Sequence, residues 1–180
     1  MGLSYWGSNF TVANPNINSF ANSLSTNSLV TAGINTTVFK PLNEKNFIIF
    51  QASSDVNGLF EGAKDIQSKA ITTSATLIYG WKTSEKNMIG TGLARTYRAG
   101  QLIHVPVIFW NKTFNEKWGM ELLLPARAYL RYNFSTSNIL QAGFELEGNQ
   151  YWANIPGVEN AYIQRGEIKP RIMWDKKISG

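Results

Sequence analysis

Apolar and polar residues alternate with a period of two along most of the chain after Leu29. A clear case is "ATLIYGW", in which Ala75, Leu77, Tyr79 and Trp81 share one face. The segments "VTAGINTTVF", "IHVPVIF" and "ILQAGFELEG" repeat the alternation. Because successive side chains of a strand point to opposite faces of a sheet, this pattern predicts half-buried β-strands. No segment has a convincing apolar stripe with helical spacing. The best candidate is "FEGAKDIQSKA", which we expect to be a long loop with room for one helical turn.

The segment "WGMELLLPARAYLRY" has the strongest alternation in the chain. One parity is apolar throughout, beginning at Trp118 and ending at Tyr132. The other parity carries Glu121, Arg127 and Arg131. A strand between lipid and a polar lumen needs this pattern, with aromatic residues at the two interfaces. In a soluble β domain the same apolar face would lie in the core and the charges in water.

Short polar turns separate the predicted strands, and three of them share a Glu-Lys pair: "KPLNEKNF", "KTSEKNM" and "KTFNEKW". Turns are predicted near Leu42–Asn46, Thr83–Asn87, Thr113–Lys117 and Ser135–Asn138, with a fifth beginning at "DKKISG". Longer connections are predicted at Asn57–Lys69 and at "GNQYWANIPGVENA". Short connections at one end and longer ones at the other indicate an up-and-down meander, and outer-membrane barrels show the same asymmetry.

These elements predict an all-β fold, an antiparallel up-and-down transmembrane β-barrel of about 8–10 strands. Residues 1–28 are predicted as an Asn- and Ser-rich N-terminal arm or loop, and residues 29–180 as the β-barrel domain. If "WGMELLLPARAYLRY" is one strand, eight strands result, but the short turns on its two sides then fall at opposite ends. A tight corner at Leu124-Pro125-Ala126 restores the alternation and gives nine.

An odd count conflicts with the even strand number of bacterial single-chain barrels. The chain also stops at "WDKKISG", in a predicted turn with no strand after it. We therefore expect one or more strands beyond Gly180, or a chain that is a fragment or one piece of a larger barrel.

The polar faces of the last strands predict a lumen lined by opposite charges. Folding "LRYNFSTSNIL" about Thr136 places Arg127 opposite Glu145 and Arg131 opposite Gln141. Opposite charges directly across an antiparallel pair contribute roughly 0.2–1 kcal/mol each. We expect the charged residues to fill a small barrel, and a basic, anion-selective passage is the alternative. The predicted lumen charge ladder consists of Glu121, Arg127, Arg131, Glu145, Glu147, Arg165, Glu167, Lys169 and Arg171.

Aromatic residues gather beside the short turns, where amphipathic rings suit the headgroup region of a bilayer. The predicted lipid-facing residues and aromatic belt are Trp81, Trp110, Trp118, Leu122, Tyr132 and Phe134. The alternative is a soluble β-barrel or sandwich that binds an apolar ligand in its interior. In the membrane hypothesis Leu122 faces lipid and Arg127 faces in, whereas in the soluble hypothesis Leu122 faces in and Arg127 faces water.

Composition agrees with one folded domain and narrows the function. The chain has 180 residues, of which 13% are aromatic and only 16% charged. The net charge of +5 is spread without a Lys/Arg block, so a nucleic-acid partner is disfavoured. There is no Cys and only one His, so a His/Cys metal site is ruled out. The apolar runs are too short for a transmembrane helix, which leaves a closed barrel as the route into a membrane.

No sequence motif indicates catalysis. His104, beside Pro106 on a predicted strand, is expected to be a packed or interfacial residue. The glycines of "IGTGLARTYRAG" match neither a phosphate loop nor a dinucleotide fingerprint. Asp55, Glu61 and Asp65 do not have the spacing of a known calcium loop. We therefore predict a non-enzymatic protein with no catalytic residue, no metal and no cofactor.

The run "WGMELLLPARAYLRYNFSTSNILQAGFELEGNQYW" resembles a family of uncharacterised outer-membrane β-barrel proteins of Gram-negative bacteria. The resemblance covers residues 29–175, and "PLNEKNFIIF" looks like the early hairpin of that family. In the family a Trp-led strand, a Leu-Pro pair, a Tyr-rich strand, a small turn and a Gly…Glu-Gly…Tyr segment recur in order. The matching residues here are Trp118, Leu124-Pro125, Tyr129, Tyr132, Gly143, Glu147-Gly148 and Tyr151.

The resemblance implies a fold and a location, the bacterial outer membrane, and brings no catalytic residues. From the sequence as a whole we predict a structural, transport or assembly-subunit role in the envelope, with the lipid bilayer and other envelope proteins as partners and no nucleic acid. The sequence departs from the family in two features: "MGLSYWGSNF" is not a signal peptide, and no closing aromatic-ended strand is present.

Overall fold

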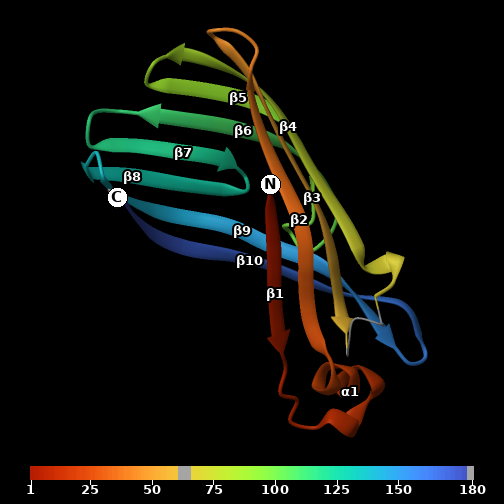
Figure 1. The fold of residues 1–180 in the computed structure, drawn as a ribbon. Coiled ribbons are helices and arrows are strands. Elements are labelled where there is room, and N and C mark those ends of the chain that lie inside the picture. The colour runs from red at the N-terminus through yellow and green to blue at the C-terminus, as the bar shows by residue number, and fades with distance from the viewer. Residues whose placement is uncertain (61–65, 178–180) are drawn as a thin grey trace.

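The computed structural model describes residues 1–60 and 66–177 and shows an all-β chain. The strands of this described part form one sheet in which each pairs with the next along the chain (Figure 1). They are β1 (Gly2–Asn9), β2 (Ser28–Pro41), β3 (Asn46–Phe60), β4 (Ile71–Ser84), β5 (Asn87–Thr96), β6 (Ile103–Thr113), β7 (Trp118–Leu124), β8 (Arg127–Ser135), β9 (Asn138–Ile155) and β10 (Val158–Lys176). The meander predicted from the alternation is therefore present.

A parallel contact between β3 and β9 closes part of this sheet. Gly58 pairs with Trp152 and Leu59 with Ala153, which joins β3 to β9 into a closed seven-stranded barrel. β4 pairs with β3 only as far as Val56, and β2 occupies the opposite edge of β3 along its whole length. β9 therefore takes the part of the β3 edge that β4 leaves free.

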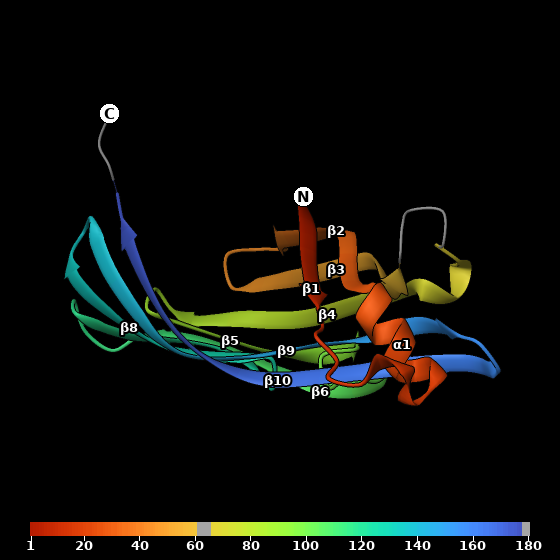
Figure 2. The ribbon, with the colours of Figure 1, turned by 90° about the horizontal axis from the view of Figure 1, so that it is seen from below.

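β1, β2 and β10 lie outside the closed ring. Figure 2 shows the sheet strongly curved, with β1 to β3 on one side and β10 along the other. Within the described residues, β1 pairs only with β2 and β10 only with β9. Over residues 1–60 and 66–177, the meander thus ends in two edge strands that have no second backbone partner.

The four predicted short turns are confirmed, and all lie at the same end of the strands. Asn43 Oδ1 accepts hydrogen bonds from the backbone N–H groups of Lys45 and Asn46 at 2.9 and 2.8 Å. Asn115 Oδ1 makes the same pair of bonds to Lys117 and Trp118, at 2.9 and 2.8 Å. The repeated Asn-Glu-Lys stretches are therefore Asx turns, in which the Asn side chain satisfies the backbone of the hairpin.

The predicted corner at Leu124-Pro125-Ala126 is also confirmed and separates β7 from β8. This corner and the N-terminal strand β1 bring the described strands to ten, within the predicted range of 8–10.

The first 28 residues contain more structure than the predicted arm or loop. Gly2–Asn9 forms β1, a one-turn 3-10 helix follows at Pro15–Ile17, and α1 spans Ser19–Thr26. The prediction that the chain has no helix was wrong, because α1 is short and its start is fixed by a cap rather than by an apolar stripe. Asn18 Oδ1 accepts a hydrogen bond from the N–H of Ala21 at 2.7 Å. Among the described residues, no helix has the length and apolar character needed to cross a membrane.

The two predicted long connections differ from the structure. The segment "GNQYWANIPGVENA" forms the facing ends of β9 and β10, joined by a tight turn at Pro156-Gly157, so the loop prediction was wrong. In the other, Asn57–Phe60 still belongs to β3 and Ser68–Ala70 forms one 3-10 turn. Residues 61–65 lie outside the described part of the chain, as do residues 178–180 of the predicted fifth turn.

Side chains that point into the barrel form an apolar cluster near each end. Near the short turns the cluster is Phe47, Ile49, Ile78, Ala94 and Val107. At the opposite end it is Leu29, Leu59, Tyr151, Ala153 and Ile155. The interior is therefore packed by side chains, as expected for a barrel of this size, and the polar residues lie between the two clusters.

Candidate functional site

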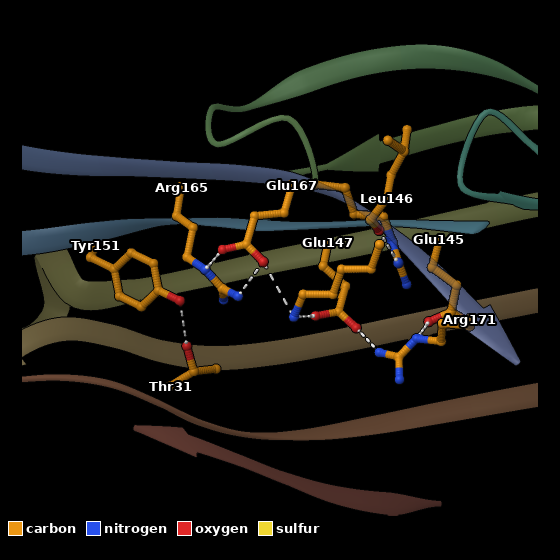
Figure 3. A network of polar contacts seen from close by, with 10 residues as sticks. Thr31, Glu145, Leu146, Glu147, Tyr151, Arg165, Glu167 and Arg171 are labelled. Carbon is orange, nitrogen blue, oxygen red and sulfur yellow. Dashed lines mark hydrogen bonds and ion pairs between the residues drawn. The ribbon is translucent and has the colours of Figure 1, made fainter. Parts of the chain in front are cut away.

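Inward-facing charges on β9 and β10 form one continuous network (Figure 3). Arg165 Nε donates to Glu167 Oε1 at 2.6 Å, and Lys169 Nζ lies 3.3 Å from Glu167 Oε2. Lys169 Nζ also donates to Glu147 Oε2 at 2.5 Å, and Arg171 pairs with Glu147 and, at 2.8 Å, with Glu145. The network crosses between the two strands several times, so it fixes their register by charge as well as by backbone hydrogen bonds.

A second, smaller group of charges lies on the inner face of β7 and β8. Arg131 Nη1 donates to Glu121 Oε1 at 3.0 Å, and Arg131 Nη2 donates to the hydroxyl of Thr113 at 2.9 Å. The predicted register is confirmed, since Arg127 lies opposite Glu145 and Arg131 opposite Gln141. The ladder predicted as one set is thus two groups on adjoining parts of the wall.

Arg127 is the exception within the predicted ladder. Its register partner Glu145 is paired with Arg171 instead. Within residues 1–60 and 66–177, no carboxylate lies at ion-pair distance from the Arg127 guanidinium.

A buried polar cluster that the sequence did not predict joins four strands, β2, β3, β4 and β9. The Thr31 hydroxyl donates to Asn57 Oδ1 at 2.7 Å and lies 3.2 Å from the Tyr151 hydroxyl. Asn57 Nδ2 donates to the Thr72 hydroxyl at 2.6 Å. Buried polar groups of this kind stabilise only when paired, as these are. The four residues come from distant segments of the sequence. The one feature they share in the sequence is a position on the inward-facing parity of their strands.

Trp6 connects the two edges of the sheet. Its ring, on β1, lies 4.2 Å from the guanidinium carbon of Arg165 on β10, a cation–π distance. The same ring is 6.1 Å from that of Tyr151.

A cavity of about 520 Å³ lies between these groups. One wall, from β2, β3 and β4, presents hydroxyl and amide side chains. The other presents Arg127, Glu145, Glu147 and Arg165 from β8 to β10. The β5–β6 connection also contributes to the cavity wall through Arg98, whose Nη1 donates to the Leu146 carbonyl at 2.7 Å. Desolvation lowers the pKa of Arg98, and the Coulombic attraction of Glu145 and Glu147 opposes this.

The predicted aromatic belt lies on the outer face beside the short turns. Trp118 and Tyr132 have ring centroids 4.8 Å apart, Tyr132 and Phe134 also 4.8 Å, and Phe134 and Trp174 6.5 Å. Trp110 Nε1 donates to Asn87 Oδ1 at 2.8 Å. The predicted belt did not include Trp174, although its place just before "DKK" matches that of the other aromatic residues beside turns.

The described residues do not assemble a metal site. No group of three or more His, Cys, Asp or Glu side chains in that part of the chain is arranged so that it could hold a metal ion. His104 is exposed on β6, with its parity on the outer face. Of the acidic loop residues, Glu61 and Asp65 lie outside the described residues, and Asp55 accepts from Ser4 and Ser53 at 3.2 and 3.0 Å.

The fold and its interior define the class of protein: an all-β, partly closed meander barrel with a charge-lined interior. The chain belongs to the family described as "Domain of unknown function (DUF6268)", which it matches over residues 2–178. No curated protein and no solved structure matches the chain.

Proposed function

We propose that this protein is a non-enzymatic β-barrel of the bacterial outer membrane. The observation that carries the proposal is the apolar outer surface. Leu77, Leu93, Leu130, Ile168 and Ile172 are each between 55% and 79% exposed, on outward positions of β4, β5, β8 and β10. Fully burying one such side chain is worth roughly 1.5–3 kcal/mol, so a surface of this kind favours an apolar environment over water.

The direction of the side chains supports the same conclusion. Arg127 lines the cavity, and Leu122 has the outward parity of its neighbours Trp118 and Leu130. This is the arrangement that the membrane hypothesis requires and the reverse of the one required by a soluble barrel with an apolar interior.

The aromatic side chains and the turns give further support. Trp118, Tyr132, Phe134 and Trp174 form a chain of ring contacts on the outer face beside the short turns. Such a row suits the headgroup region at one side of a bilayer. The connections at the other end include the two longest ones, between β1 and β2 and between β3 and β4.

We assign the charge ladder a structural role. The ion pairs of Glu147 with Lys169 and Arg171 cross from β9 to β10, and the pair of Arg131 with Glu121 joins β8 to β7. Side chains and the β5–β6 connection fill much of the interior. The proposed role is therefore an envelope barrel that holds a small solute or takes part in a larger envelope assembly, with the bilayer as its first partner.

Refolding tests this proposal. The urea-unfolded chain is diluted either into detergent micelles or lipid vesicles, or into buffer alone, and followed by circular dichroism and sedimentation. We expect a folded β spectrum only with detergent or lipid, and aggregation without them. A monomeric, folded chain in buffer alone would exclude the membrane role and favour the soluble barrel.

A further inference from the structure

Arg98 and Arg127 bring two positive charges to one corner of the cavity. Arg98 donates to the Leu146 carbonyl, and the Leu146 N–H donates to the carbonyl of Ala126, the residue before Arg127. Burial lowers the pKa of Arg98 most, and Coulombic repulsion from Arg127 lowers it further. Two like charges close together are unfavourable unless negative groups lie beside them, and the carboxylates that attract Arg98 are those of Glu145 and Glu147.

The carboxylates nearby are already used by other cations. Glu145 is paired with Arg171, and Glu147 is paired with both Lys169 and Arg171. Arg98 donates one N–H to the Leu146 carbonyl, and Arg127 has no ion pair among the residues that the structure describes. The corner therefore has a surplus of guanidinium donors directed at the cavity.

The opposite wall of the cavity has a different chemistry. It carries neutral side chains that both donate and accept hydrogen bonds: Thr31, Asn35, Thr37, Gln51, Ser53 and Thr76. Among the described residues of this wall the one carboxylate, Asp55, is held by the hydroxyls of Ser4 and Ser53. A row of hydroxyl and amide groups suits a ligand rich in hydroxyl groups.

We infer that the cavity binds a small hydroxylated solute that carries one anionic group. The anionic group pairs with Arg127 and Arg98, since a planar guanidinium matches carboxylate and phosphate oxygens two at a time. The hydroxyl groups of the solute face the wall formed by β2, β3 and β4. The cavity volume of about 520 Å³ falls in the range of small-ligand pockets. The site lies inside the barrel and does not depend on the membrane, so its test is independent of the proposed location.

Calorimetric titration of the folded protein with three probes tests this inference. Glucuronate carries a carboxylate, glucose 6-phosphate carries a phosphate, and glucose carries no charge. We expect saturable binding of at least one acid, and binding of glucose at least about tenfold weaker. The acid that binds more tightly identifies the anionic group that the site prefers. No saturable binding of either acid, or equal binding of glucose, would overturn the inference.

Variants locate the binding in the cavity. Arg127→Gln is expected to weaken binding of the acid by at least about tenfold, and Arg127→Lys by less, because it keeps the charge and loses the planar fork. Arg95→Gln is the matched control, since Arg95 lies on the outer face of β5 and hydrogen-bonds Thr73. Arg127→Lys keeps the test decisive if Arg127→Gln does not fold. Binding that is unchanged in the Arg127 variants, or equally weakened in Arg95→Gln, would contradict the site.

Discussion

At the scale of single residues, a few carboxylates add ion pairs to the backbone pairing of β9 and β10. Glu147 accepts from both Lys169 and Arg171, which are themselves only partly exposed. Removing one partner of a shielded charge pair costs more than the pair contributes, because the remaining charge loses water without gaining a partner. The 29% exposure of Glu147 moderates this cost.

Glu147→Gln tests the structural role of the ladder. We expect this variant to lower the free energy of unfolding by about 1–2 kcal/mol, since two cations lose their shared carboxylate. Urea unfolding in detergent, followed by tryptophan fluorescence, measures the change. Glu85→Gln is the control, because Glu85 pairs with Lys82 at an exposed turn and its loss should change stability by less than about 0.5 kcal/mol. Equal effects of the two substitutions would contradict the role of the ladder.

The residues of the ladder were predictable and those of the buried polar cluster were not. Arg127, Arg131 and Glu145 alternate with apolar residues on two strands joined by a recognisable turn, so their register follows from counting. Thr31, Asn57, Thr72 and Tyr151 meet only when β2, β3, β4 and β9 come together. No local pattern predicts such a contact.

At the scale of elements, glycine makes room where strands approach closely. A Cβ on Gly143 of β9 would lie 1.9 Å from the Ala128 carbonyl oxygen and 2.8 Å from the ring of Tyr129. Tyr129 is buried and lies directly opposite Gly143 in the register. The backbone of β8 and the ring of Tyr129 would both have to shift for any larger residue.

Gly143→Ala is therefore expected to destabilise the protein by about 1–3 kcal/mol through overpacking. The urea midpoint in detergent checks this value. Gly7→Ala on β1 is the matched control, because its nearest neighbour would be the Tyr5 hydroxyl at an ordinary 3.4 Å. A Gly143→Ala variant as stable as Gly7→Ala would show that β8 and β9 do not pack as closely as described.

Strands were predicted correctly where apolar and polar residues alternate over a long segment. The prediction failed where a strand is rich in residues typical of loops. Strands from β2 to β8 follow their period of two, and their short turns carry Asn, Ser or Thr. β1 and the facing ends of β9 and β10 are rich in Asn, Gly and Ser or Gln, residues typical of loops. Their pairing with a neighbouring strand overrides this local preference.

At the scale of the whole molecule, the sequence predicted a barrel but not how it closes. The parallel contact between β3 and β9 joins segments nearly a hundred residues apart and leaves no local signal. It also leaves β1 and β10 as edges, which carry exposed apolar side chains such as Leu3 and Ile168. Unpaired strand edges do not persist in hydrocarbon, so the membrane proposal requires a partner for both.

We predict that β1 and β10 pair with each other in a bilayer. Both Trp6 and Arg165 point inward and already touch, and the two strands run antiparallel, so Trp6 would lie opposite Arg165. In that register Leu3 lies opposite Ile168. Because the chain has no Cys, the double variant Leu3→Cys with Ile168→Cys should form an intramolecular disulfide in vesicles.

The control for this pairing is Leu3→Cys with Trp174→Cys, which is out of register by six residues in the predicted pairing and should not cross-link within one chain. Gel mobility without and with reductant distinguishes the two variants. Disulfide-linked dimers would instead indicate that each edge strand pairs with a second copy of the chain. No disulfide in either variant would contradict the pairing of β1 with β10.

The central claim is that the outer face of this barrel contacts lipid and the inner face does not. Leu77 and Thr76 are neighbours on β4, the first 55% exposed on the outer face and the second lining the cavity. Single-Cys variants at these two positions test the claim. Each variant is labelled with an environment-sensitive fluorophore and refolded into vesicles whose spin-labelled acyl chains quench the fluorescence. We predict strong quenching at residue 77 and little at residue 76. Equal quenching at both positions, or stronger quenching at residue 76, would contradict it.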